Sequence, residues 1–291
     1  MKRRLVINLA LLGLVALLGL VVLLPSLQPA EDTGPAETTS SLGRQLGLAD
    51  DGPTRLRVRH GADQIRLSRH EGRWRLTSPV NAPADAAHLE VIHALHTSTA
   101  LRAVDGRNLP GTLTGLDEPL VVQYDDAPPI RVGGPGPNGV TRYVSAAGRT
   151  WLVPLAHYDT LAWHWTDWLD RALVPEGHAL RRIVLPNYTL EYHEATGWQV
   201  QPENRRAQGA GAATAAAWRR AAALAIVPAD RSRERLARVT LVFADASRQV
   251  FDIIERGPNL VLRREALGVD YHLAGNRIGP LLKLVHPDLS K

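Results

Sequence analysis

An apolar segment near the start of the chain restricts its folding more than any other feature. The twenty residues 5–24 include no charged side chain, and as a helix they reach about 30 Å, roughly the hydrocarbon thickness of a bilayer. A cleaved signal peptide is the alternative, but its apolar core is usually about 7–15 residues long and ends in small residues. Residues 25–30 offer no good cleavage site. The sequence therefore predicts an uncleaved transmembrane helix at residues 5–24.

Charge on the two sides of this segment predicts its orientation. Three basic residues precede it, whereas the first basic residue after it is Arg44. Because basic residues resist translocation, we expect the N-terminus in the cytoplasm and the rest of the chain exported. Residues 1–24 then form a cytoplasmic stub with its anchor. Residues 25–52, rich in Pro, Gly, Ser, Thr and acids, form a flexible linker.

The remaining composition excludes several classes of protein. The calculated pI is 9.9, but without the three basic residues before the apolar segment the chain has 31 basic and 29 acidic residues, a net charge of +2. A chain that is nearly neutral outside its anchor lacks the general signature of nucleic-acid binding. The absence of cysteine excludes disulfides, thiolate metal sites and cysteine nucleophiles.

Two stretches of the chain, about 120 residues apart, contain the same succession of expected strands and helix. Alternating apolar and polar residues predict strands, and a helical pattern follows the third strand of each stretch. The first stretch has expected strands at 55–59, 64–69, 72–76, 120–126, 130–132, 142–144 and 150–153, and a helix at 84–97. The second has expected strands at 182–185, 189–193, 197–200, 239–245, 249–253, 260–263 and 270–273, and a helix at 218–226.

This repetition predicts an α+β fold after the transmembrane helix. We expect two tandem, internally duplicated modules, each a short antiparallel sheet with a helix, at residues 53–175 and 176–291. A further helix is expected at 154–172, between the two.

Several short motifs resemble those of a known family. They are G-R-W-R-L at 72–76, G-L-D-x-P at 115–119, R-Y-V at 142–144 and A-W-R-R-A at 217–221, after an Arg-rich N-terminus and an anchor. Together they resemble the DUF4340 family of bacterial envelope proteins, over roughly residues 50–290. That family has no assigned chemistry, and its members are often encoded beside ABC transporter genes. The resemblance implies a single-pass protein of the bacterial inner membrane, mostly periplasmic, that assists such a transporter.

Arginines along the first three expected strands form the sharpest candidate site. If these strands pair as hairpins, the arginines share the face opposite the apolar residues. They are Arg55, Arg57, Arg59, Arg66, Arg73 and Arg75. Like charges opposite one another destabilise a sheet by a few tenths of a kcal/mol per pair, which suggests a counter-charge from elsewhere in the chain, a partner or an anionic headgroup. The alternative is that an Arg-biased chain solvates its sheet with arginine.

Aromatic residues in the expected helix 154–172 provide a second candidate. Trp165 and Trp168 lie on the apolar stripe of this helix, where they are expected to pack, whereas Trp163 lies off it. An exposed tryptophan is typical of a binding anchor or of a contact with the membrane interface. The alternative for Trp163 is a peripheral packing contact.

The remaining candidate motifs favour structural interpretations. His88, His93 and His96 share the expected helix 84–97, but His88 and His96 border its apolar stripe, and we expect no metal site. The glycine-rich residues 133–139 have strands on both sides and contain two prolines, so a loop between strands is expected, not a phosphate-binding loop.

Enzyme motifs are missing from the sequence. It has no G-x-S-x-G, H-E-x-x-H or S-x-x-K serine motif, and Asp125-Asp126 lies at an expected hairpin end, where aspartate is favoured. We therefore expect a protein without cofactors that is not an enzyme: an accessory or scaffold subunit of a membrane complex such as an ABC-type transporter. Its contacts would come from the anchor, the arginines and Trp163. The alternative is a module that binds an anionic lipid headgroup or glycan; an uncharacterised enzyme is third.

Overall fold

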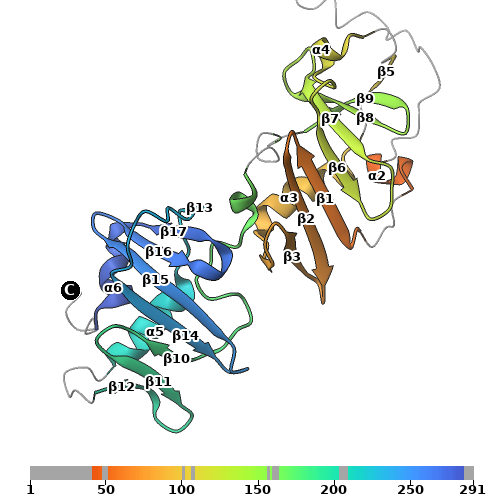
Figure 1. Cartoon of the computed structure of the whole chain (residues 1–291). Coiled ribbons are helices and arrows are strands. Elements are labelled where there is room, and N and C mark those ends of the chain that lie inside the picture. The colour runs from red at the N-terminus through yellow and green to blue at the C-terminus, as the bar shows by residue number, and fades with distance from the viewer. Residues whose placement is uncertain are drawn as a thin grey trace, which may run out of the picture. The chain divides into compact units, whose positions relative to one another are not determined.

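The computed structural model describes residues 41–47, 52–99, 102–105, 109–155, 158, 164–202 and 209–284. Two large antiparallel sheets make up most of this part of the chain (Figure 1). Short helices pack on one face of each sheet.

The first sheet is built from the N-terminal half of the described residues. Its strands are β1 (Arg55–His60), β2 (Asp63–His70), β3 (Arg73–Ser78), β4 (Ala82–Pro83), β5 (Arg102–Val104), β6 (Leu120–Tyr124), β7 (Ile130–Pro135), β8 (Thr141–Ala146) and β9 (Arg149–Pro154). They lie in the order β4-β3-β2-β1-β6-β7-β8-β9-β5.

The second sheet follows in the chain. Its strands are β10 (Leu180–Val184), β11 (Thr189–His193), β12 (Gly197–Gln201), β13 (Ala225–Pro228), β14 (Ala237–Phe243), β15 (Arg248–Arg256), β16 (Leu260–Arg264) and β17 (Val269–Leu273). They lie in the order β12-β11-β10-β14-β15-β16-β17-β13.

Apart from β4, the two sheets have the same strand order. In each, three strands form a meander, a helix and an edge strand follow, and four more strands complete the sheet. The first strand pairs with the first of those four, β1 with β6 and β10 with β14. The edge strand pairs with the last, β5 with β9 and β13 with β17.

The core of the first sheet lies beneath α3 (Ala86–Thr97). The Asp85 carboxylate caps the first turn of this helix by accepting hydrogen bonds from its backbone N–H groups. On the sheet side, Ile92 and Leu95 are buried, and the buried Tyr124 hydroxyl donates a 2.9 Å hydrogen bond to the Ile92 carbonyl. This bond satisfies the polar end of a buried ring.

The core of the second sheet lies beneath α5 (Ala210–Arg220) and α6 (Ile278–Leu282). Trp218 is fully buried, and its Nε1–H donates a 3.0 Å hydrogen bond to the Leu281 carbonyl. Its ring lies 6.1 Å from that of Phe251 on β15. Trp218 on α5 thus contacts both α6 and the sheet.

The predicted fold class is wrong in the size of its sheets. The sequence predicts a short sheet and a meander in each module, but β1 pairs on one side with β2 and on the other with β6, at Leu56 opposite Tyr124. The meander therefore extends the same sheet, and the fold is mostly antiparallel sheet. Alternation reveals that a segment has one buried face; it does not reveal which distant strand becomes its partner.

Two predicted helices are also wrong. Residues 165–168 of the expected helix 154–172 form a 3-10 helix, and the extended Leu169 and Ala172 pair with Ala84 and Ala222. The expected helix 218–226 lies earlier, as α5, because residues after it leave the helix to form the edge strand β13 against β17. Backbone pairing with other segments overrides the helical pattern in both places.

The predicted anchor, residues 5–24, lies outside the described residues. Among the helices that the structure describes, none is long and apolar enough to cross a membrane. Within the expected linker 25–52, residues Leu42–Gln45 form α2, and Leu42 is fully buried against α3.

Candidate anion-binding surface

The arginines predicted to share a face lie on the side of the first sheet that faces away from α3. On β1, Arg55, Arg57 and Arg59 are exposed and alternate with the buried Leu56 and Val58. The alternation follows from the strand period of two, which places neighbouring residues on opposite faces.

Strand register brings arginines from different strands together. Arg57 and Arg66 are directly opposite each other, and Ser68 lies between Arg55 and Arg75 in the next row. Arg73, opposite His70, follows on β3. Cross-strand neighbours on one face have Cβ atoms about 4.5–5.5 Å apart, so Arg57 and Arg66 repel each other.

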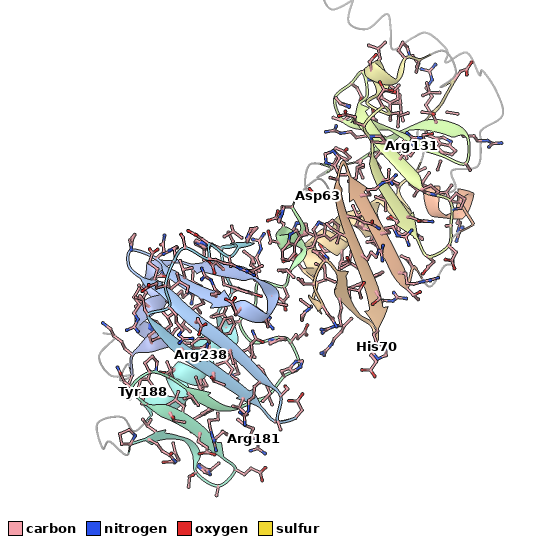
Figure 2. All side chains as sticks on the ribbon, in the orientation of Figure 1. Asp63, His70, Arg131, Arg181, Tyr188 and Arg238 are labelled. Atoms are coloured by element: carbon pink, nitrogen blue, oxygen red, sulfur yellow. The ribbon has the colours of Figure 1, made fainter. Side chains whose placement is uncertain are left out.

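One member of this surface, Arg131 on β7, was not predicted from the sequence. It is exposed, alternates with the buried Ile130 and Val132, and shares a row with Arg59 through Val121 (Figure 2 labels Arg131). The alternation of apolar and polar residues around Arg131 is visible in the sequence. The pairing of β7 with β6, which places Arg131 in the row of Arg59, is not. We call this surface the arginine face; it comprises Arg55, Arg57, Arg59, Arg66, Arg73, Arg75 and Arg131.

Neutral acceptors hold several of these guanidinium groups. Arg57 donates to the Gln123 amide oxygen at 3.0 Å, and Arg75 donates to that of Asn81 at 3.0 and 3.2 Å. Backbone carbonyls of Glu176 and Leu116 accept from Arg73 and Arg131, at 3.0 and 3.2 Å. These contacts orient the guanidinium groups without neutralising their charge.

Carboxylates contact this face at the turn after β6. There Arg55 pairs with Asp126 at 2.8 Å and with Asp125 at 3.7 Å. Within the part of the chain that the structure describes, Arg59 and Arg66 have no ion-pair partner. The face therefore carries uncompensated positive charge.

The second sheet has an ion pair where the first has two arginines. Arg182 on β10 pairs in register with Val242 of β14, as Arg57 pairs with Gln123 of β6. On its other side Arg182 faces Glu191, with which it forms an ion pair. The same topological position is thus neutral in the second sheet and doubly positive in the first.

Asp125 binds both backbone and side-chain groups at the start of β1. Its carboxylate accepts hydrogen bonds from the Thr54 hydroxyl at 2.8 Å and from the Arg55 N–H at 2.8 Å. Burial acts to raise the pKa of Asp125, but the hydrogen bonds from Thr54 and Arg55 outweigh it and lower the pKa. This carboxylate fastens the start of β1 to the turn after β6.

The histidines of α3 lie at the edge of the core. His88 is buried, with Nδ1 3.2 Å from the Asp85 carboxylate, and its ring lies 5.4 Å from that of Trp168. The rings of His93 and His96 stack at 6.2 Å. Burial, followed by the neighbouring His93, lowers the pKa of His96. No group of three candidate metal ligands occurs among the described residues.

The glycine-rich residues 133–139 divide between strand and turn. Gly133 and Gly134 belong to β7, not to the expected loop, and the turn itself is organised by Asn138, whose side chain accepts from Thr141. A Cβ atom on Gly133 would lie 2.2 Å from the Thr114 carbonyl oxygen. These glycines permit close approach of two backbone segments.

Of the predicted aromatic candidates, Trp163 lies outside the described residues. Trp168 is fully buried, and Trp165 is half-buried against the core.

No family model, curated protein or solved structure matches this chain.

Proposed function

We propose that the chain is a non-enzymatic accessory protein whose arginine face docks an acidic surface of a partner protein. The observation that carries the proposal is the like-charge pair Arg57–Arg66, which stands where the second sheet has Arg182–Glu191. The repulsion between two arginines is relieved when a carboxylate binds between them.

The way these arginines are held favours a protein partner over a lipid surface. Side-chain amides and backbone carbonyls fix the orientation of Arg57, Arg75, Arg73 and Arg131. An oriented guanidinium group matches a carboxylate through two parallel hydrogen bonds, which needs a partner of defined shape. A layer of mobile headgroups needs only positive charge.

The setting that we propose is a membrane complex such as an ABC-type transporter, on the periplasmic side of the bacterial inner membrane. The charge pattern around residues 5–24 and the resemblance to the DUF4340 family support this setting. Both supports come from the sequence.

A photo-crosslinking residue in place of Ser68 tests the proposal, because Ser68 lies between Arg55 and Arg75. The full chain is irradiated in cells, and crosslinked peptides are mapped. We expect one protein partner, crosslinked at an acidic segment. The capture should weaken as salt is raised before irradiation of isolated membranes.

The matched variants decide between specific docking and general charge. The triple change Arg57→Glu, Arg66→Glu, Arg75→Glu should abolish the crosslink. The control Arg149→Glu, Arg248→Glu, Arg277→Glu alters net charge equally at exposed sites elsewhere and should keep it. Equal loss in both sets contradicts the proposal. A different outcome would point to a lipid surface. In it, no protein is crosslinked, the unchanged chain binds phosphatidylglycerol vesicles, and only the first triple change abolishes that binding.

A further inference from the structure

A cleft on the second sheet has the composition of a ligand site that the arginine face does not explain. It has a volume of about 590 Å³ and lies where the loop 177–179, β10–β12 and the end of α5 meet. Figure 2 labels Arg181, one of its lining residues. Small-molecule sites usually have volumes of about 300–1,000 Å³.

Two aromatic rings form one wall of the cleft. Tyr192 and Trp198 face each other across β11 and β12, on the same side of the sheet as the buried Leu190. Their rings meet edge to face at 5.6 Å, and 37% of Tyr192 is exposed. Part of this apolar surface is thus open to a ligand at the edge of the core.

A β-bulge aims Arg181 at these rings. Leu180 pairs with Phe243 and Arg182 with Val242, so Arg181 is an extra residue on β10. Its guanidinium carbon lies 5.6 Å from the centre of the Tyr192 ring. The corresponding pair β1–β6 has an unbroken register, so this bulge is specific to the second sheet. Bulges commonly redirect a side chain at functional sites.

Two arginines and a histidine line the cleft beside the aromatic wall. Arg219, in the last turn of α5, is exposed and has no ion-pair partner among the residues that the structure describes. His178 lies on the loop, its ring packed edge-on against Phe243 at 5.4 Å. Of the described residues that line the cleft, one is acidic: Glu194, which pairs with Arg181 at 3.1 Å and is 82% exposed. With Glu194 balancing Arg181, Arg219 leaves the cleft net positive.

We propose that this cleft binds a small anion attached to a ring with an apolar face. The phosphate or carboxylate would contact Arg219 and Arg181, and the ring would cover Tyr192 and Trp198. A charge-assisted contact gives direction, and burial of the ring on an aromatic surface adds affinity that a bare anion lacks. A sugar phosphate and an aryl phosphate both satisfy this chemistry.

Fluorine NMR of the full chain labelled with 5-fluorotryptophan tests the proposal. Disappearance of one resonance in Trp198→Phe assigns the Trp198 signal. The probes are glucose 6-phosphate, phenyl phosphate, inorganic phosphate and glucose. We expect a ring-bearing phosphate to shift the Trp198 signal with an affinity at least about tenfold above that of inorganic phosphate and of glucose. The tighter of the two ring-bearing probes identifies the ring as sugar or aromatic.

Adjacent arginines on α5 supply the matched pair of variants. Arg219 lines the cleft, whereas Arg220 is also exposed and in the same helical turn but is not part of the lining. Arg219→Glu should lower the affinity for the ring-bearing phosphate by about tenfold or more, which is the contribution of one charge-assisted contact. Arg220→Glu should change this affinity by no more than about twofold. No response of Trp198 to either ring-bearing phosphate overturns the proposal, as does equal weakening by the two variants.

Discussion

At the scale of single residues, a row of alternating charge crosses the second sheet. The order across four strands is Arg238, Asp252, Arg263 and Asp270, each opposite the next in register. The row becomes more buried along its length: the side chains of Arg263 and Asp270 are 7% and 2% exposed, and Arg238 is 53% exposed. Backbone carbonyls of Asp230 and Arg233 complete the contacts of Arg263.

Loss of one member of the buried pair should strongly destabilise the protein. Asp270→Asn leaves the Arg263 charge buried without a counter-charge, which costs about 3–5 kcal/mol in the free energy of unfolding. Urea unfolding measures this cost. The control Arg238→Met should cost about 1 kcal/mol or less, because its site is exposed and Asp252 keeps Arg235 nearby at 3.7 Å. The double change Arg263→Met, Asp270→Leu should cost less than Asp270→Asn alone; a larger cost contradicts the argument.

A second residue-scale prediction concerns pH and the cap of α3. Burial acts to raise the pKa of Asp85, but hydrogen bonds from His88 and Ala87 outweigh it and lower the pKa. A carboxyl with a lowered pKa in the folded state stabilises the fold above its unfolded pKa and loses this contribution as pH falls through the folded value.

Asp85→Asn keeps an oxygen acceptor at the cap and removes the charge. At pH 7 we expect the variant to be less stable by about 0.5–1 kcal/mol, with the difference shrinking as pH falls below about 4. Chemical unfolding from pH 7 to pH 3 measures the difference. Asp63→Asn, at the exposed start of β2, is the control. A difference that stays constant over this pH range contradicts the prediction.

At the scale of elements, the G-L-D-x-P motif follows α4 (Gly111–Thr114) and lies against the strand β7. Gly115 ends this helix with φ +65°, and a Cβ atom on it would lie 2.4 Å from the Gly134 nitrogen. Gly139 has a similar φ of +72° but nothing within 4 Å of such an atom. The glycine of this motif therefore has a structural role, because it permits close contact with the backbone of β7.

These two glycines separate backbone strain from steric contact. Gly139→Ala should cost about 1–2 kcal/mol, the strain of a left-handed alanine. Gly115→Ala should cost at least about 1–3 kcal/mol more, because the added methyl group forces α4 and β7 apart. Thermal or urea unfolding of both variants provides the comparison. Equal costs would mean that the backbone shifts freely at Gly115.

The pairing of β1 with β2 allows stability and binding to be separated. Arg66→Glu places a carboxylate opposite Arg57, as Glu191 lies opposite Arg182 in the second sheet. We expect the free energy of unfolding to rise by about 0.2–1 kcal/mol while capture of the partner falls. Glu191→Arg should lower the free energy of unfolding and leave capture of the partner unchanged. Loss of both stability and capture in Arg66→Glu would indicate that Arg66 serves the fold.

At the scale of the whole molecule, charge balance conceals local asymmetry. The chain outside the N-terminal basic residues has a net charge of only +2, yet arginines concentrate on one face of the first sheet. The corresponding position of the second sheet holds an ion pair. The two sheets share a strand order apart from β4, but their surfaces differ in charge. The functions that we propose for them differ accordingly.

Much of this arrangement could be predicted from the sequence, and the failures share a cause. Alternation located β1, β2 and β6, and with them the shared face of Arg57 and Arg66, because side-chain direction in a strand depends only on residue parity. The short strands β4, β5 and β13 were not predicted, and neither was the bulge at Arg181. These features depend on a distant partner.

The sequence by itself therefore determined where the longer strands occur and which of their side chains share a face, since both follow from local periodicity. Tertiary structure alone decided that β1 joins β6 in one large sheet, that Arg131 belongs to the arginine face, and that Arg181 turns toward Tyr192. The physical reason is that a strand satisfies its backbone hydrogen bonds with whichever edge the whole chain presents, and no local pattern encodes that choice.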